Sequence, residues 1–215
     1  MSIKATVSPW KLFLVLSAGM FFLCQSVWAE ENVYPWQLKK DDEGIRVWVR
    51  KVEGSPILEY KAEMNLKEPL AKVLAVYEDE SKMPKWFHQC TSAGLIRTES
   101  AERKVLYFTL AMPWPVSDRD ASYLREKTVD ANGGASYNIS ALPSEVPVKD
   151  GLVRMPYLKG VWRFSPGEDG TTDVFVQQHA DAGGHIPAVI VNRLVVDIPF
   201  NSLKGLRKLL SKTAD

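Results

Sequence analysis

The sequence predicts an α+β fold in which a curved antiparallel sheet wraps around one long C-terminal helix. Three observations predict it: most of the chain alternates apolar and polar residues, a single helical segment interrupts the strands early, and the last amphipathic segment is long. A sheet with one apolar face must bury that face against another layer. The final helix is the available layer, and a curved sheet around a helix can enclose an apolar cavity.

The first 29 residues have the features of an export signal. A weakly basic start precedes an apolar run from Leu12 to Leu23, and Val27-Trp28-Ala29 offers a cleavage site. The run is roughly 12 residues, whereas a helix that spans a bilayer needs about 20. We expect residues 1–29 to be a cleaved signal peptide, residues 30–215 to form one domain, and the protein to be periplasmic or secreted. A retained membrane anchor is the alternative.

Composition and charge narrow the class of protein. Hydrophobic residues make up 46% and charged residues 25%, as in ordinary globular proteins, which excludes disordered and collagen-like chains. The chain has 27 basic and 26 acidic residues; loss of Lys4 and Lys11 with the leader leaves 25 against 26, a net charge of −1. Binding to nucleic acid therefore lacks its usual electrostatic basis. Cys24 also lies in the leader, so Cys90 is alone in the mature chain and no intramolecular disulfide is expected.

Strand-like segments make up most of the mature chain. We expect a short helix over Pro35–Lys40, then a hairpin whose strands alternate over Ile45–Arg50 and Leu58–Met64. Pro69 begins a helix with apolar residues at spacings of three and four, and Pro84 is expected to end it. Further strands are expected at Ala93–Thr98, Val105–Met112, Asp120–Val129, Ala135–Ala141, Leu152–Phe164 and Thr172–His179.

The final helix is expected to run from Pro187 to about Ser211. Its apolar residues, among them Ile190, Leu194 and Ile198, recur at spacings of three to five, and Pro199 is a candidate kink. Basic residues gather near its end, where they complement the helix dipole or, as an alternative, contact anionic lipid headgroups.

Four short motifs resemble the START family, the lipid-transfer domains related to steroidogenic acute regulatory protein. They are Gly44–Trp48, Pro113–Asp120, Tyr157–Trp162, and Asp181–Pro187 with Asn192 in the helix that follows, all in the family's order and spacing. The resemblance spans about residues 36–210. It implies a helix-grip fold with a tunnel that holds one lipid-like molecule beneath the last helix, and it implies passive carriage of that ligand. An exported member looks bacterial and periplasmic.

The resemblance also implies a role for Arg125. Its position matches the place where several family members put a buried arginine inside the tunnel, and strand alternation puts Ala121, Tyr123 and Arg125 on one face. In sterol-binding members an acidic partner comes from the preceding strand, which here has no carboxylate over Val105–Leu110. We therefore expect Arg125 to await a ligand with a negative group. The alternative is an outward arginine in a surface ion pair with Glu126 or with an acidic residue on a neighbouring strand.

The remaining candidates could line a tunnel or fill a core. Tyr60, Tyr107 and Trp162 lie on strands, and Trp114, between two prolines, either packs under its loop or contacts the ligand. Arg119, between two aspartates, is expected to be structural. The candidate ligand-binding set is Arg125, Tyr123, Ala121, Tyr107, Tyr60, Trp162, Ile190, Leu194 and Ile198.

Residue types that carry catalysis show no matching pattern. His88, Cys90, His179 and His185 fit neither zinc-ligand spacing nor a thiol with its base, and no glycine-rich phosphate loop is present. We expect no metal and no cofactor. The leading hypothesis is a monomeric, non-catalytic carrier of a lipid or other hydrophobic small molecule, with transient membrane contact and no nucleic-acid partner. The alternative is a cyclase or hydrolase of the wider helix-grip superfamily, acting on a hydrophobic substrate.

Overall fold

The computed structural model describes residues 34–212. The expected signal peptide, residues 1–29, lies outside the described residues. The strands are β1 (Gln37–Asp42), β2 (Ile45–Val52), β3 (Ser55–Leu66), β4 (Cys90–Thr98), β5 (Arg103–Leu110), β6 (Asp118–Val129), β7 (Ala135–Ala141), β8 (Leu152–Arg154), β9 (Tyr157–Pro166) and β10 (Thr172–Asp181). The helices are α1 (Leu70–Tyr77), α2 (Met83–Trp86) and α3 (Ala188–Lys212), with short 3₁₀ turns η1 (Glu80–Lys82) and η2 (Glu168–Gly170).

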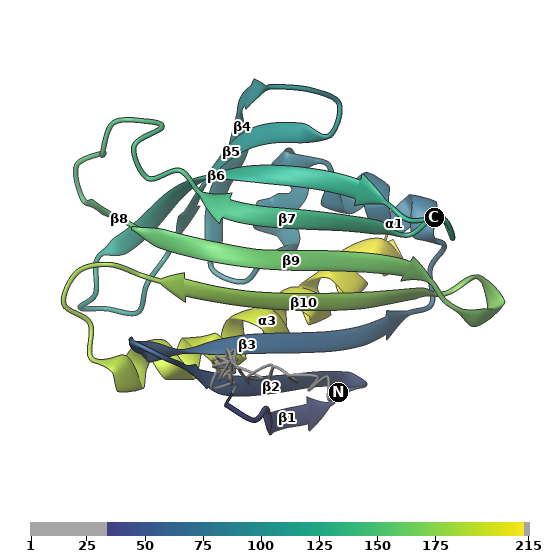
Figure 1. The fold of residues 1–215 in the computed structure, drawn as a ribbon, viewed down its shortest axis with the longest axis horizontal. Helices are drawn as coiled ribbons and strands as arrows, with labels where there is room; N and C mark the ends of the chain where they lie inside the picture. The colour runs from purple at the N-terminus through teal and green to yellow at the C-terminus, as the bar shows by residue number, and fades with distance from the viewer. Residues whose placement is uncertain (1–33, 213–215) are drawn as a thin grey trace, which may run out of the picture. The chain divides into compact units, whose positions relative to one another are not determined.

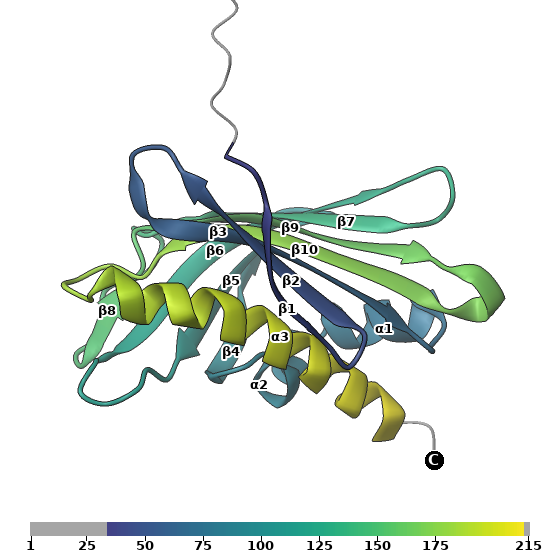
Figure 2. The same ribbon diagram turned by 90° about the horizontal axis from the view of Figure 1, so that it is seen from below.

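The strands form one sheet in the order β1-β2-β3-β10-β9-β7-β6-β5-β4, in which neighbouring strands are antiparallel (Figure 1). The short strand β8 pairs with β6 in parallel. Figure 2 shows α3 crossing one face of this sheet, with α1 and α2 on the same side. The α+β architecture expected from the sequence, a curved sheet around a long C-terminal helix, is confirmed.

The expected helix over Pro35–Lys40 is wrong. Residues 37–42 form β1, which pairs with β2 through a two-residue turn at Glu43 and Gly44. Both turn residues have positive φ, 51° and 72°, the backbone of a tight hairpin turn that glycine adopts readily. Pairing with β2 supplies hydrogen bonds that the local sequence pattern does not reveal, and it outweighs the helical tendency of this segment.

Pro84 acts differently from the sequence expectation, and one expected strand is divided in two. Pro84 does not end the helical region, because it lies in the first turn of α2, where its missing N–H costs no hydrogen bond. Pro199 lies inside α3, which continues through it to Lys212. The expected long strand over Leu152–Phe164 is divided into β8 and β9.

The core lies between the concave face of the sheet and the helices. Leu203, Leu206 and Leu210 in the second half of α3 are fully buried. This half of α3 packs tightly on α2, because a Cβ atom at Gly205 would lie 2.3 Å from the carbonyl oxygen of Trp86. Within the described chain, none of the helices combines the length and the apolar character that crossing a membrane requires.

Candidate functional site

Two adjacent cavities lie on the concave side of the sheet. The first, called the Arg125 cavity, has a volume of about 40 Å³ and has a largely aromatic wall. The second, called the α3 cavity, has a volume of about 80 Å³ and lies under the first half of α3. Phe87, Phe108 and Gln178 line both, so the two cavities are neighbours across these side chains.

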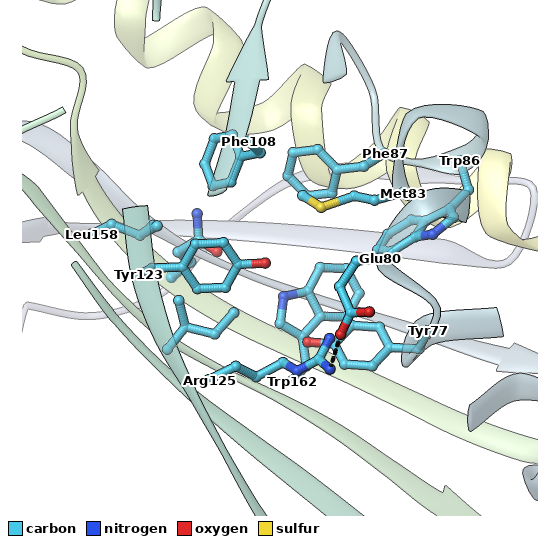
Figure 3. Close-up of a pocket in the computed structure, with 12 residues that line it drawn as sticks. Tyr77, Glu80, Met83, Trp86, Phe87, Phe108, Tyr123, Arg125, Leu158 and Trp162 are labelled. Carbon is cyan, nitrogen blue, oxygen red and sulfur yellow. Dashed lines mark hydrogen bonds and ion pairs between the residues drawn. The ribbon is translucent and has the colours of Figure 1, made fainter. Parts of the chain in front are cut away.

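Six of the nine residues expected to bind ligand line these cavities. Tyr123, Arg125 and Trp162 line the Arg125 cavity and are drawn among its lining side chains in Figure 3. The α3 cavity is lined by Tyr60, Leu194 and Ile198.

Tyr107 lies elsewhere. Its neighbour Phe108 faces the cavities, so strand alternation directs Tyr107 to the opposite face of the sheet. There its hydroxyl donates a hydrogen bond of 2.8 Å to Asp120, and the ammonium of Lys149 lies 4.4 Å from its ring centre. Burial, together with the carboxylate of Asp120, raises the pKa of Tyr107 to about 12. The expectation that Tyr107 lines the tunnel is wrong.

Ile190 and Ala121 also line neither cavity. Ile190 is 38% exposed, and Val191 lines the α3 cavity in its place, one residue around the helix. Ala121 is fully buried and lies directly opposite Phe108 in the β5–β6 register. The larger ring of Phe108 forms the cavity wall at this level of the sheet, so Ala121 belongs to the packed core.

Arg125 has an acidic partner that the sequence pattern did not reveal. Its Nη2 atom donates a hydrogen bond of 2.7 Å to Oε1 of Glu80, and the side chains are 7% and 17% exposed. Glu80 lies in η1, where the carboxylate of Asp79 caps the turn, and not on the strand before Arg125. Lys104 lies 3.4 Å from the same oxygen. The expectation of an unpaired arginine is therefore wrong, and the dashed line in Figure 3 marks the pair.

Arg119 lines the α3 cavity and is 3% exposed. Its guanidinium donates to the carbonyl oxygens of Ala182 and Gly183, each at 3.0 Å, and to that of Ser117. These bonds tie the start of β6 to the loop between β10 and α3. The sequence pattern assigned Arg119 a structural role at its own strand, and no local signal indicated that two of its three partners lie more than 60 residues away.

Two polar groups in the cavity walls lack a hydrogen-bond partner within the described part of the chain. They are the hydroxyl of Tyr60, in the α3 cavity, and the indole Nε1 of Trp86, in the Arg125 cavity. Burial raises the pKa of Tyr60, so its hydroxyl stays protonated at neutral pH. A ligand oxygen next to either group would accept the unused hydrogen bond.

The residues considered for catalysis remain apart from the cavities. Burial raises the pKa of Cys90 to about 11, which keeps its thiol neutral at pH 7. Nε2 of His179 lies 3.2 Å from Oγ of Ser55, and its ring packs against that of Tyr157. Among residues 34–212, no cluster of three or more His, Cys, Asp and Glu side chains is arranged to hold a metal ion.

The sequence and the structure were compared with those of known proteins. An uncharacterized protein of Pseudomonas aeruginosa is 36% identical over 200 residues, which cover 92% of this chain and 96% of that one. The phosphatidylcholine transfer protein of Bos taurus is 27% identical over 180 residues, 80% of this chain and 83% of that protein. The crystal structure of a STAR-related lipid transfer protein from Xanthomonas axonopodis has a TM-score of 0.76 at 38% identity, covering 82% of this chain and 98% of that one.

The profile of the START domain matches residues 28–214, nearly the whole chain. Together with the curved sheet around α3, this match shows that the chain belongs to the START family.

Proposed function

We propose that this protein binds one hydrophobic, lipid-like molecule between its sheet and α3 and transfers it without changing it chemically. The observation that carries the proposal is the pair of adjacent cavities with largely apolar walls on the concave side of the sheet, one of which lies under α3. Burial of a hydrocarbon chain contributes about 0.8 kcal/mol per methylene, so a dozen methylenes contribute roughly 10 kcal/mol before ordering costs. That free energy is sufficient for micromolar or tighter binding.

Lipid uptake requires the cavities to widen. A volume of about 40 or 80 Å³ holds a few water molecules or a short apolar segment, whereas an acyl chain needs several times more. The first half of α3 is the element that can move away, because Val191, Leu194, Val195 and Ile198 form the wall of the α3 cavity.

The second half of α3 is held more firmly. Glu43 in the β1–β2 turn accepts hydrogen bonds from Lys204 and Arg207, and Oγ of Ser202 accepts one from the backbone N–H of His88. Pro199 lies between the two halves and lacks the N–H that would bond to the preceding turn. We propose that the first half opens as a lid while the second half stays in place.

Membrane contact is proposed at the end of the molecule where the lid begins. Trp114, in the β5–β6 loop, is 92% exposed, and Val189, at the start of α3, is 76% exposed. Arg119 connects these two regions through its bonds to Ser117 and Ala182. Exposed aromatic and aliphatic side chains beside a cavity can enter the apolar boundary of a bilayer when the lid opens.

A carrier is favoured over the enzyme alternative by the state of the charged groups in the Arg125 cavity. Glu80 lines this cavity, but its carboxylate forms an ion pair with Arg125 at 2.7 Å and is therefore not available as a catalytic base.

We further propose a monomer whose residues 1–29 are removed on export to the periplasm. N-terminal sequencing of protein from fractionated cells tests the export: a start near Glu30 supports it, and intact Met1 in the membrane fraction contradicts it.

The test of binding uses a fluorescent acyl probe and native mass spectrometry of the purified protein. We expect one probe molecule per chain. Leu194→Trp fills the α3 cavity and should weaken binding about tenfold or more. Arg193→Trp introduces the same side chain at an exposed position of the same helix, outside the cavity lining, and should leave binding unchanged. Absence of probe binding, or equal losses in both variants, contradicts the proposal.

A further inference from the structure

Arg119 is a buried cation without a carboxylate at ion-pair distance within the described residues. Three of its five N–H groups donate to backbone carbonyl oxygens, those of Ser117, Ala182 and Gly183. Carbonyl groups satisfy hydrogen bonds but do not supply the negative charge of an ion-pair partner. Burial lowers the pKa of Arg119, yet an arginine remains charged at every ordinary pH.

The two aspartates beside Arg119 are engaged elsewhere. Asp120 is fully buried and binds Nε and Nη2 of Arg154, each at 2.8 Å, as well as the hydroxyl of Tyr107. Asp118 accepts a hydrogen bond of 2.9 Å from the backbone N–H of Met112 and acts on Arg119 only through its charge, outside ion-pair distance. The charge of Arg119 thus differs from that of Arg125, which Glu80 neutralises.

A second unsatisfied group lines the same cavity. Tyr60 is 5% exposed, and its hydroxyl has no partner within residues 34–212. The remaining wall includes the aliphatic side chains of Leu194, Val195 and Ile198. An apolar cavity that contains a cation without an ion-pair partner and an unused hydroxyl is suited to a ligand that brings negative oxygen atoms on an apolar chain.

We infer that Arg119 and Tyr60 bind the oxyanion headgroup of a single-chain lipid, a carboxylate or a phosphate monoester, in the α3 cavity. This inference rests on the proposed function and names the ligand class for that site. The two free N–H groups of Arg119 match two oxygen atoms of one headgroup. The chain runs past Phe87 and Phe108, which line both cavities, into the Arg125 cavity, and the small volumes of the two cavities favour one chain over two.

The first test uses the wild-type protein and two probes with the same chain, oleate and methyl oleate. We expect the affinity for oleate to be at least about tenfold higher than the affinity for methyl oleate. This difference is on the scale of one charge-assisted hydrogen bond. With oleate ¹³C-labelled at its carboxyl group, NMR should show the bound carboxyl titrating at a lower pH than in vesicles. Equal affinity for both probes overturns the inference and leaves the proposed function intact. If neither probe binds, the proposed function fails as well.

A second arm separates lipid headgroups from free anions. Dodecyl phosphate should compete with labelled oleate, whereas acetate and inorganic phosphate at millimolar concentration should not, because they lack the chain. Displacement by the free anions would identify a site for soluble ions and overturn the lipid assignment.

Variants then locate the headgroup. Arg119→Met should abolish the preference for oleate and raise the titration pH of the bound carboxyl, with folding checked by circular dichroism. The neutral double variant Arg125→Met with Glu80→Gln should keep the ratio of oleate to methyl oleate affinity. The reverse result would place the headgroup at Arg125 and overturn the inference.

Tyr60→Phe removes only an unpartnered hydroxyl, so it folds in any case and should weaken oleate binding several-fold. If Arg119→Met does not fold, an unchanged oleate affinity in Tyr60→Phe overturns the inference.

Discussion

Oε1 of Glu80 lies 2.7 Å from Nη2 of Arg125, although the two residues are 45 positions apart and belong to elements that face each other across a cavity. The pair joins the η1 turn to strand β6 of the sheet. It also removes the unpaired charge that the strand sequence alone predicted for this position. The consequence is a cavity wall in which Arg125 contributes to stability through Glu80.

The first prediction follows from this pair. Arg125→Met leaves the carboxylate of Glu80 buried with only Lys104 nearby, so it should lower the free energy of unfolding by about 3 kcal/mol, the cost of breaking a buried ion pair. Denaturant unfolding followed by circular dichroism measures this change. The double variant with Glu80→Gln should recover most of the loss. If the single variant is as stable as the wild type, the pair contributes nothing to folding.

The sequence predicted the elements whose patterns are local and strong. Strand β7 has the expected bounds, Ala135–Ala141, and the final helix differs by one residue at each end. The same reasoning failed at β1, whose structure depends on pairing with β2. Local periodicity describes one segment at a time, so it cannot report a partner elsewhere in the chain.

The candidate site shows the same limit in its residues. Alternation along β6 correctly placed Tyr123 and Arg125 on one face. Alternation alone could not decide which face of β5 turns inward, so Tyr107 was predicted to line the cavity where Phe108 does. Helical spacing left a similar ambiguity of one residue between Ile190 and Val191. Glu80 was missed because its contact with Arg125 exists only in three dimensions.

The second prediction concerns acid stability. A hydrogen bond from Arg154 holds the pKa of Asp120 below its ordinary value of 3.8, with a further bond from Tyr107. Because the folded-state pKa is the lower one, the ionised carboxylate contributes stability that is fully present above about pH 5 and is lost as the pH falls through the folded-state pKa. In Asp120→Asn, unfolding free energy measured between pH 6 and 2 should be lower at pH 6 and should depend less on pH. An unchanged slope below pH 4 would show that other carboxylates account for acid unfolding.

The third prediction concerns the membrane. Trp114→Ala should weaken binding to phospholipid vesicles about tenfold or more, because a large aromatic side chain no longer enters the bilayer boundary. Binding of a water-soluble fluorescent acyl probe should not change. Leu95, half-exposed on the edge strand β4, provides the control, since Leu95→Ala removes a similar apolar group away from the lid. Equal vesicle binding by Trp114→Ala and the wild type contradicts this docking surface.

The fourth prediction concerns the contact that holds the lid. Oδ1 of Asn192 accepts a hydrogen bond of 2.9 Å from the N–H of Leu58, and its Nδ2 donates one of 3.2 Å to the carbonyl of Pro56. Asn192→Ala removes both bonds, at a cost of about 1 to 2 kcal/mol for the closed state, so lipid exchange between vesicles should accelerate about 5- to 30-fold. Lys204→Met, which removes an exposed ion pair in the fixed half of α3, should leave the exchange rate unchanged. Acceleration in both variants would mean that the whole helix moves.

The last prediction tests the lid directly by closing it with a covalent bond. Cysteines replace Asn192 and either Pro56 or Leu58, whose backbone groups Asn192 contacts, in a chain where Cys90→Ala has removed the buried native thiol. The disulfide holds the first half of α3 against β3, so exchange of a fluorescent lipid between vesicles should stop in the oxidised protein and return after reduction. The single-cysteine variants, treated with the same oxidant and reductant, should exchange lipid under both conditions and thereby control for the chemistry. Mass spectrometry verifies the disulfide in the oxidised double variant. If exchange continues unchanged in that protein, the ligand passes through another part of the molecule, because a covalently closed lid cannot widen the cavity beneath it.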